Sequence, residues 1–273
     1  MALEVVLLAI HGIGDTPIDF ADKMKKKLSK ELKGDWSSVY FDTVYYQSIF
    51  QKNERRVFQA TKKKYDIDSI LLRKLLLFGF SDAAGLERRA GQPGSPYEQA
   101  QRIILATLDK VFTFLDEESK PVVILAQSLG GQVLSNYIWD AQKKKGIWAD
   151  GGPAGADPGS PRDKFRRLKS LRFLYTTGCN IPVFVSGLPE SKISAIATSS
   201  KGYSLKWKNY YDPDDPLGWP LRSLSKSYEE EVDRDYPINA GGIFKSWNPL
   251  SHTAYWTDDD VIEPLARDIR KLI

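Results

Sequence analysis

The sequence is poor in cysteine and histidine, and it holds no long apolar run. Cys179 is the only cysteine among 273 residues, which excludes an internal disulfide and suits a reducing compartment. No segment is long enough and apolar enough to cross a bilayer. The net charge of +4 is small for this length, and the lysine-rich runs are separated by acidic residues. A nucleic-acid-binding protein would need a continuous basic face, so that class of protein is excluded.

The first ten residues are apolar but do not have the pattern of a signal peptide. They lack a basic first region, contain Glu4, and run directly into a His-Gly turn. We therefore predict a first strand here and a cytoplasmic protein. Apolar residues make up 42% of the chain, enough for a core of ordinary size. The length fits a single domain at 1–273, with one insertion.

Short apolar runs alternate with amphipathic stretches along the chain. Strands are predicted at Glu4–Ile10, Val39–Tyr46, Val122–Ala126, Leu171–Thr177 and Ser204–Tyr211. Helices are predicted at Asp19–Leu32, Tyr97–Leu115, Leu129–Lys145 and Asp259–Ile273. This alternation predicts an α/β fold with a mainly parallel sheet and helices on both of its faces.

A long insertion lies at about 48–92, between the second predicted strand and the following helix. Connections of this length inside a domain are often lids. Its apolar stretch, Ile70–Phe80, fits a lid that lines an acyl pocket or makes transient contact with a membrane surface, with Arg73 and Lys74 near the headgroups. It fits equally well a core helix that covers the edge of the sheet. The sequence leaves both interpretations open.

The residues around Ser128 carry the strongest chemical signal. An apolar strand ends in Gln127, and a helix is predicted to start directly after Ser128. A serine in such a tight strand–turn–helix needs small residues two positions before and after it, and these are Ala126 and Gly130. This pattern resembles the α/β-hydrolase superfamily, in particular its esterase and lipase branch, in which this serine is the nucleophile. The competing interpretation is an ordinary strand-to-helix loop.

A His-Gly turn, His11-Gly12, directly follows the first predicted strand. In the hydrolases that this chain resembles, such a turn forms one wall of the oxyanion hole. The resemblance implies the backbone N–H of Ile13 and that of Leu129 as the two donors, and His11 as a turn-stabilising residue. The alternative is a turn that needs glycine only for its shape. A phosphate loop is excluded because no G-x-x-x-x-G-K-[ST] follows.

With only two histidines in the chain, His252 becomes the candidate base once His11 is assigned to the turn. It lies just before the last predicted helix, where the resemblance places the catalytic histidine. An ordinary packed histidine is the alternative.

The acid has several candidates in one segment, Asn209–Leu217. Some phospholipase-like hydrolases carry a similar N-x-x-x-P-x-D-P stretch, and the resemblance implies Asp215 as the acid. Asp212 and Asp214 remain as alternatives, as does a solvated acidic turn. The Asp258-Asp259-Asp260 run is better explained as a helix N-cap.

Ser128, Asp215 and His252 follow the chain order expected for α/β-hydrolases. They predict a serine hydrolase that cleaves carboxylic esters, from small molecules or lipids, through an acyl-enzyme and with no metal or organic cofactor. A thioesterase or amidase would use the same three residues. A non-catalytic binding module of the same fold is the alternative from another class. The oligomeric state is left open.

Overall fold

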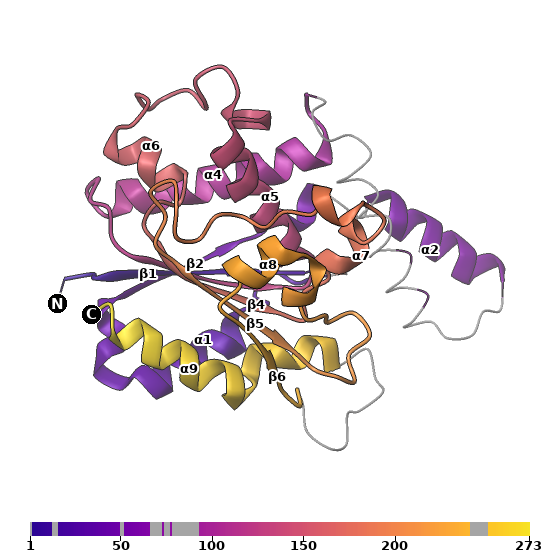
Figure 1. Ribbon diagram of the computed structural model, residues 1–273. Coiled ribbons are helices and arrows are strands. Elements are labelled where there is room, and N and C mark those ends of the chain that lie inside the picture. Colours follow the sequence, from indigo (N-terminus) through magenta and orange to yellow (C-terminus); the bar gives the residue numbers. More distant parts are fainter. Residues whose placement is uncertain are drawn as a thin grey trace.

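Six strands of the computed structural model form one sheet, in which every neighbouring pair is parallel (Figure 1). The structure describes residues 2–12, 16–49, 52–65, 73, 77, 93–240 and 251–273. The strands are β1 (Val5–Ile10), β2 (Val39–Val44), β3 (Val122–Gln127), β4 (Leu171–Thr177), β5 (Lys206–Tyr211) and β6 (Arg234–Pro237). Five of them were predicted from the sequence, and the edge strand β6 was not.

Helices cover both faces of the sheet, as predicted (Figure 1). The α-helices are α1 (Asp22–Leu32), α2 (Lys52–Lys64), α4 (Pro96–Phe114), α5 (Leu129–Lys143), α6 (Pro161–Arg166), α7 (Ile181–Val185), α8 (Lys226–Glu231) and α9 (Asp259–Arg270). The 3₁₀ helices are η1 (Lys33–Ser38), η2 (Gln47–Ile49), η3 (Gly146–Trp148), η4 (Glu190–Lys192), η5 (Arg222–Leu224) and η6 (Ser251–Thr257).

The core has two layers because successive side chains of each strand point to opposite faces. In β1, Val5 and Leu7 pack in the layer under α1 and α9, whereas Val6 and Leu8 pack in the layer under α4 and α5. All six residues of β1 are buried, as are all six of β3. Such continuous apolar runs are typical of parallel strands that are covered on both sides.

The helix ends follow from their capping residues. The Asp258 side chain accepts a hydrogen bond from the N–H of Asp260 at the start of α9, which confirms the predicted N-cap. Helix α4 begins with Pro96 in its first turn, and Ser95 caps it by accepting from the N–H of Glu98.

The strand order β2-β1-β3-β4-β5-β6 places a reversal between β1 and β3. The chain passes from β1 to β2 on one side and later returns to β3 on the other side. In open parallel sheets, such a reversal leaves a crevice at the carboxyl ends of the two strands, where ligands bind. Ile10 pairs with Ala126 across this point. The turns that begin with His11 and with Ser128 therefore start next to each other.

Most of the insertion at 48–92 lies outside the described residues, as does most of the stretch Ile70–Phe80. Its first part forms α2, a helix that the sequence did not predict. None of the helices in the described part of the chain is long and apolar enough to cross a membrane. Because most of the insertion is not described, its interpretation as a lid stays a prediction.

Candidate active site

Ser128 lies in a sharp turn between β3 and α5. Its backbone has φ 53° and ψ −126°, a region that residues other than glycine rarely adopt. The N–H of Ser128 donates to the carbonyl oxygen of Thr177 on β4 at 2.9 Å, which fixes the turn to the sheet. The side chain is buried, and its Oγ has no hydrogen-bond partner among the described residues. A strained, unpartnered serine is typical of a nucleophile turn.

Two glycines let the serine turn and the turn after β1 lock together. A Cβ on Gly130 would lie 2.4 Å from the carbonyl oxygen of His11, which is backbone and cannot move away. A Cβ on Gly12 would lie 2.6 Å from the Cβ of Ser128. The small residue predicted two positions after the serine is thus required by the close approach of the His-Gly turn.

His11 is a structural part of that turn. Its Nδ1 donates to the carbonyl oxygen of Gly12 at 2.8 Å, and its Nε2 accepts from the N–H of Tyr46 at 3.1 Å. The ring stacks on Tyr46 with 4.1 Å between centroids. Burial lowers the pKa of His11 to about 4, against the smaller opposing effect of the Gly12 hydrogen bond. The imidazole is therefore neutral, with both nitrogens in use, and is not placed to take a proton from Ser128.

His252 and Asp215 form a buried hydrogen-bonded pair. The distance from His252 Nδ1 to Asp215 Oδ2 is 2.8 Å, and both residues are at most 5% exposed. The other oxygen of Asp215 accepts from the N–H of Leu217 at 3.0 Å. Burial acts to raise the pKa of Asp215, but hydrogen bonds from His252, Leu217 and Tyr255 outweigh it and hold this pKa below its ordinary value. Asp215 is therefore ionised.

The two alternative acids have other surroundings. Asp212 is buried and caps the turn, with one oxygen accepting from the N–H of Asp214 and the other from the N–H of Ala240, each at 2.8 Å. Asp214 is exposed. Of the three aspartates in this segment, Asp215 is the one that contacts the His252 ring.

The backbone of His252 is tied to the serine turn. Gln127, the residue before Ser128, donates a hydrogen bond from Nε2 to the main-chain oxygen of His252. His252 Nε2 is buried and, within the described part of the chain, has no hydrogen-bond partner. Buried polar atoms normally have a hydrogen-bond partner. Ser128 Oγ and His252 Nε2 have none among the described residues, and this exception calls for an explanation.

Leu129 is buried and is the first residue of α5. A backbone N–H in the first turn of a helix has no partner within that helix, so the N–H of Leu129 is suited to an anion. Ile13, the other predicted donor, lies outside the described residues. In the ranges that the structure describes, no cluster of three or more His, Cys, Asp or Glu could hold a metal ion.

Two residues that contact the His252–Asp215 pair were missed in the sequence. They are Gln127 and Tyr255, whose hydroxyl donates to Asp215 Oδ2 at 2.9 Å. Gln127 directly precedes the serine, and Tyr255 follows His252 by three residues. Neither residue type has chemistry of its own that would single it out in this pattern.

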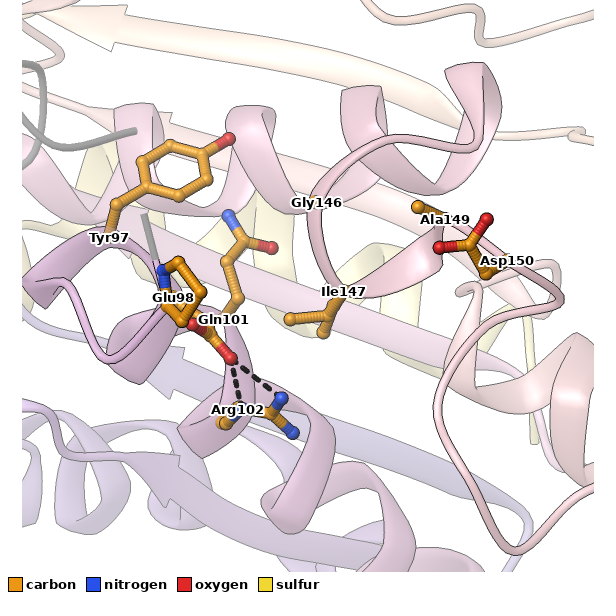
Figure 2. Close-up of a pocket in the computed structure, with 9 residues that line it drawn as sticks. Tyr97, Glu98, Gln101, Arg102, Gly146, Ile147, Ala149 and Asp150 are labelled. Carbon is orange, nitrogen blue, oxygen red and sulfur yellow. Dashed lines mark hydrogen bonds and ion pairs between the residues drawn. The ribbon is translucent and has the colours of Figure 1, made fainter. Parts of the chain in front are cut away.

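A cavity of about 380 Å³ lies between the first turns of α4 and the η3 segment. Figure 2 shows Gln101 of α4 on one side of the cavity and Ile147 of η3 on the other, with the ion pair of Glu98 and Arg102 nearby. None of its lining residues is Ser128, Asp215 or His252. The cavity is therefore separate from the candidate site.

Neither a family model nor a curated protein sequence matches this chain, and the solved esterases that align with it do so at TM-scores below 0.5. Esterase PE8 aligns over 100% of this chain and 94% of its own, with a TM-score of 0.45 and 12% identity. An acetyl xylan esterase aligns over 99% of this chain and 98% of its own, with a TM-score of 0.39 and 12% identity. The esterase domain of a Rhodothermus marinus protein aligns over 98% and 86%, with a TM-score of 0.38 and 10% identity. The chain itself has an α/β fold, with a parallel sheet between two layers of helices (Figure 1).

Proposed function

We propose that the protein is a serine hydrolase of the α/β-hydrolase type that cleaves carboxylic esters, with Ser128 as nucleophile, His252 as base and Asp215 as acid. One observation carries the proposal. Asp215 follows the carboxyl end of β5, and the strained turn of Ser128 follows the carboxyl end of β3. The His252–Asp215 hydrogen bond of 2.8 Å is buried, and Gln127 links His252 to the serine turn. Acyl transfer by a serine uses a histidine that is oriented by an acid and acts on the serine, so this pair beside the serine turn supports the proposal.

The hydrogen bond to Asp215 sets the proton positions. If Nδ1 of His252 carries the proton donated to Asp215, Nε2 is left as an acceptor. Nε2 then takes the proton of Ser128 as Oγ forms a bond to the ester carbonyl carbon. The bond from this carbon to the alcohol oxygen breaks, and His252 gives the proton to the leaving alcohol. Water, deprotonated by His252, then cleaves the acyl-enzyme to release the acid and restore Ser128.

Negative charge develops on the carbonyl oxygen during both steps. We assign its stabilisation to the N–H groups of Leu129 and Ile13. Leu129 supports this assignment because it begins α5, where unpaired N–H groups and the helix dipole favour negative charge. One such donor contributes about 3 kcal/mol to the stabilisation of the transition state.

Exposed apolar residues support an ester with an apolar part, from a small molecule or a lipid. Among the described residues, most of the large exposed apolar side chains lie in segments that follow the carboxyl ends of strands: Ile18, Val57, Tyr65, Val183, Leu188 and Trp219. Helices α2 and α7, which carry two of them, lie at the same end of the molecule (Figure 1). Exposed apolar side chains at this end of the molecule would favour acyl chains over charged substrates.

The test is hydrolysis of p-nitrophenyl esters from acetate to palmitate by the wild type, Ser128→Ala and His252→Ala. We expect turnover by the wild type and its loss in both variants. Ser29→Ala, on α1 and away from the site, is the matched control and should keep full activity. A thioester and an anilide of the best acyl group then identify the leaving group. Undiminished turnover by Ser128→Ala would contradict the proposal.

A further inference from the structure

One oxygen of Asp215 accepts two hydrogen bonds from side chains. Oδ2 lies 2.8 Å from His252 Nδ1 and 2.9 Å from the hydroxyl of Tyr255. We propose that Tyr255 is a positioning residue of the catalytic site, which holds the Asp215 carboxylate in the orientation that aligns His252. This inference rests on the proposed function and adds a fourth side chain to it.

The local helix type explains why a tyrosine three residues after the histidine reaches the same atom. Both residues belong to η6, a 3₁₀ helix. With three residues per turn, side chains at positions i and i+3 lie on the same side of such a helix. The rings of His252 and Tyr255 are perpendicular, with 6.3 Å between centroids, and both point their polar atoms at Asp215.

The Tyr255 hydroxyl has a fixed direction. It accepts a hydrogen bond from the N–H of Asp212 at 2.8 Å and donates its own proton to Asp215. The residue is fully buried, and burial, together with the charge of Asp215, raises its pKa well above the ordinary value. The phenol therefore stays protonated and remains a donor over the whole working pH range. It also joins the two ends of the turn 212–215.

Two glycines make room for this contact. A Cβ on Gly218 would lie 2.9 Å from both Asp215 Oδ2 and the Tyr255 hydroxyl oxygen. A Cβ on Gly178, which has φ +52°, would lie 2.8 Å from Cε2 of Tyr255 and 3.2 Å from Asp215 Oδ2. The backbone around Asp215 is thus built to admit a tyrosine ring, and not only the imidazole.

Loss of the hydroxyl would act on the carboxylate in two ways. Asp215 would lose the donor that, with the N–H of Leu217, restricts its rotation. Its charge would also be shared among fewer donors, so it would favour the protonated imidazole of His252 more strongly. Asp212, Asp215 and His252 are the titratable groups that face the hydroxyl among the described residues. Without the Tyr255 hydroxyl we therefore expect a slower chemical step. We also expect the acid limb of the kcat/KM pH profile to shift to higher pH, because His252 would be protonated more readily.

The experiment compares Tyr255→Phe with Tyr175→Phe. Tyr175 is an equally buried tyrosine whose hydroxyl donates to Asp268 Oδ2 at 2.6 Å, on the α9 side of the sheet. Each variant therefore loses one buried tyrosine–aspartate hydrogen bond. For Tyr255→Phe we expect kcat to fall about tenfold or more, KM to stay within about twofold, and the acid limb to move upward. Tyr175→Phe should keep the wild-type values of all three.

Equal kcat and pH profiles in the two variants would overturn the inference, even if Ser128→Ala is inactive and the proposed function holds. Activity in Ser128→Ala would instead remove the proposed function itself. If Tyr255 acts through Asp215, adding Tyr255→Phe to Asp215→Asn should lower kcat by less than about twofold more. A full additional loss would contradict this route. Should Tyr255→Phe not fold, 3-fluorotyrosine at 255 keeps the packing, and an unchanged pH profile would count against the role.

Discussion

The side-chain amide of Gln127 donates a hydrogen bond to the main-chain oxygen of His252, 125 residues further along the chain. The donor directly precedes Ser128, and the acceptor belongs to the candidate base. This contact joins the end of β3 to η6, and it fixes the backbone of His252 relative to the serine turn. Both partners are buried, so the bond is shielded from water.

Gln127→Leu should therefore impair both stability and catalysis. The change leaves the buried oxygen of His252 unpaired, which costs about 1–3 kcal/mol of the free energy of unfolding. We expect kcat to fall about tenfold as well, because the imidazole loses its alignment. Urea unfolding and ester hydrolysis measure the two effects.

Gln142→Leu is the control, since the Gln142 side chain also binds the main chain away from the site: it donates to the oxygen of Ala197 and accepts from the N–H of Ala197, each at 2.9 Å. It should lose stability and keep its kcat. Equal kcat in the two variants would refute a positioning role for Gln127.

Asp215→Asn should lower kcat by about ten-thousandfold, the loss seen when the acid of a serine triad becomes an amide and the histidine takes the wrong tautomer. Asp214→Asn, one residue away and exposed, should have wild-type kcat. Steady-state kinetics on one p-nitrophenyl ester compare the two. If Asp214→Asn were the inactive variant, the acid would be misassigned.

Gly130→Ala should destabilise the protein and abolish activity. Its Cβ would lie 2.4 Å from a backbone oxygen, so the two interlocked turns would have to separate, at about 1–3 kcal/mol. Gly34→Ala is the control, because a Cβ there meets no atom within 4 Å. Thermal unfolding of both variants checks this. A Gly130→Ala protein as stable and active as Gly34→Ala would contradict the described packing.

Because of His11, the free energy of unfolding should decrease as the pH is lowered from about 6.5 to about 4. Burial lowers the pKa of this residue to about 4, so in this range the unfolded chain binds a proton that the folded protein does not. Stability is then full above the ordinary histidine pKa and is lost as the pH falls, by roughly 3 kcal/mol at pH 4. His11→Asn does not titrate there, and its stability should depend less on pH. Equal slopes in denaturant titrations of the two proteins would disagree with a neutral, buried His11.

The sequence predicted the parts of the fold that are apolar and periodic. β4 was predicted at its observed bounds, Leu171–Thr177, because six of its seven residues are leucine, aromatic or β-branched. β6 was missed because it is four residues long, two of them charged, and ends in proline. Edge strands avoid self-association with this kind of composition, and they have no hydrophobic pattern to detect. Helix α2 was missed because ten of its thirteen residues are polar or charged.

The candidate site was predictable where one residue type carries the chemistry. Ser128 and His252 stand out by chemical type and local context, whereas Asp215 needed the resemblance because Asp212 and Asp214 lie beside it. The structure separates the three by hydrogen bonds that the sequence does not encode locally. The supporting contacts of Gln127 and Tyr255 depend on how β3, β5 and η6 meet, and no spacing along the chain reveals that.

The most direct test of the central claim is reaction with a fluorophosphonate probe, followed by mass spectrometry of the digested protein. Such a probe reacts with a serine only when a neighbouring base and donors activate it. We predict one adduct, on Ser128, formed by the wild type and lost in His252→Ala. A folded wild-type protein that stays unlabelled, or that carries the adduct on another residue, would contradict the assignment of Ser128 as an activated nucleophile.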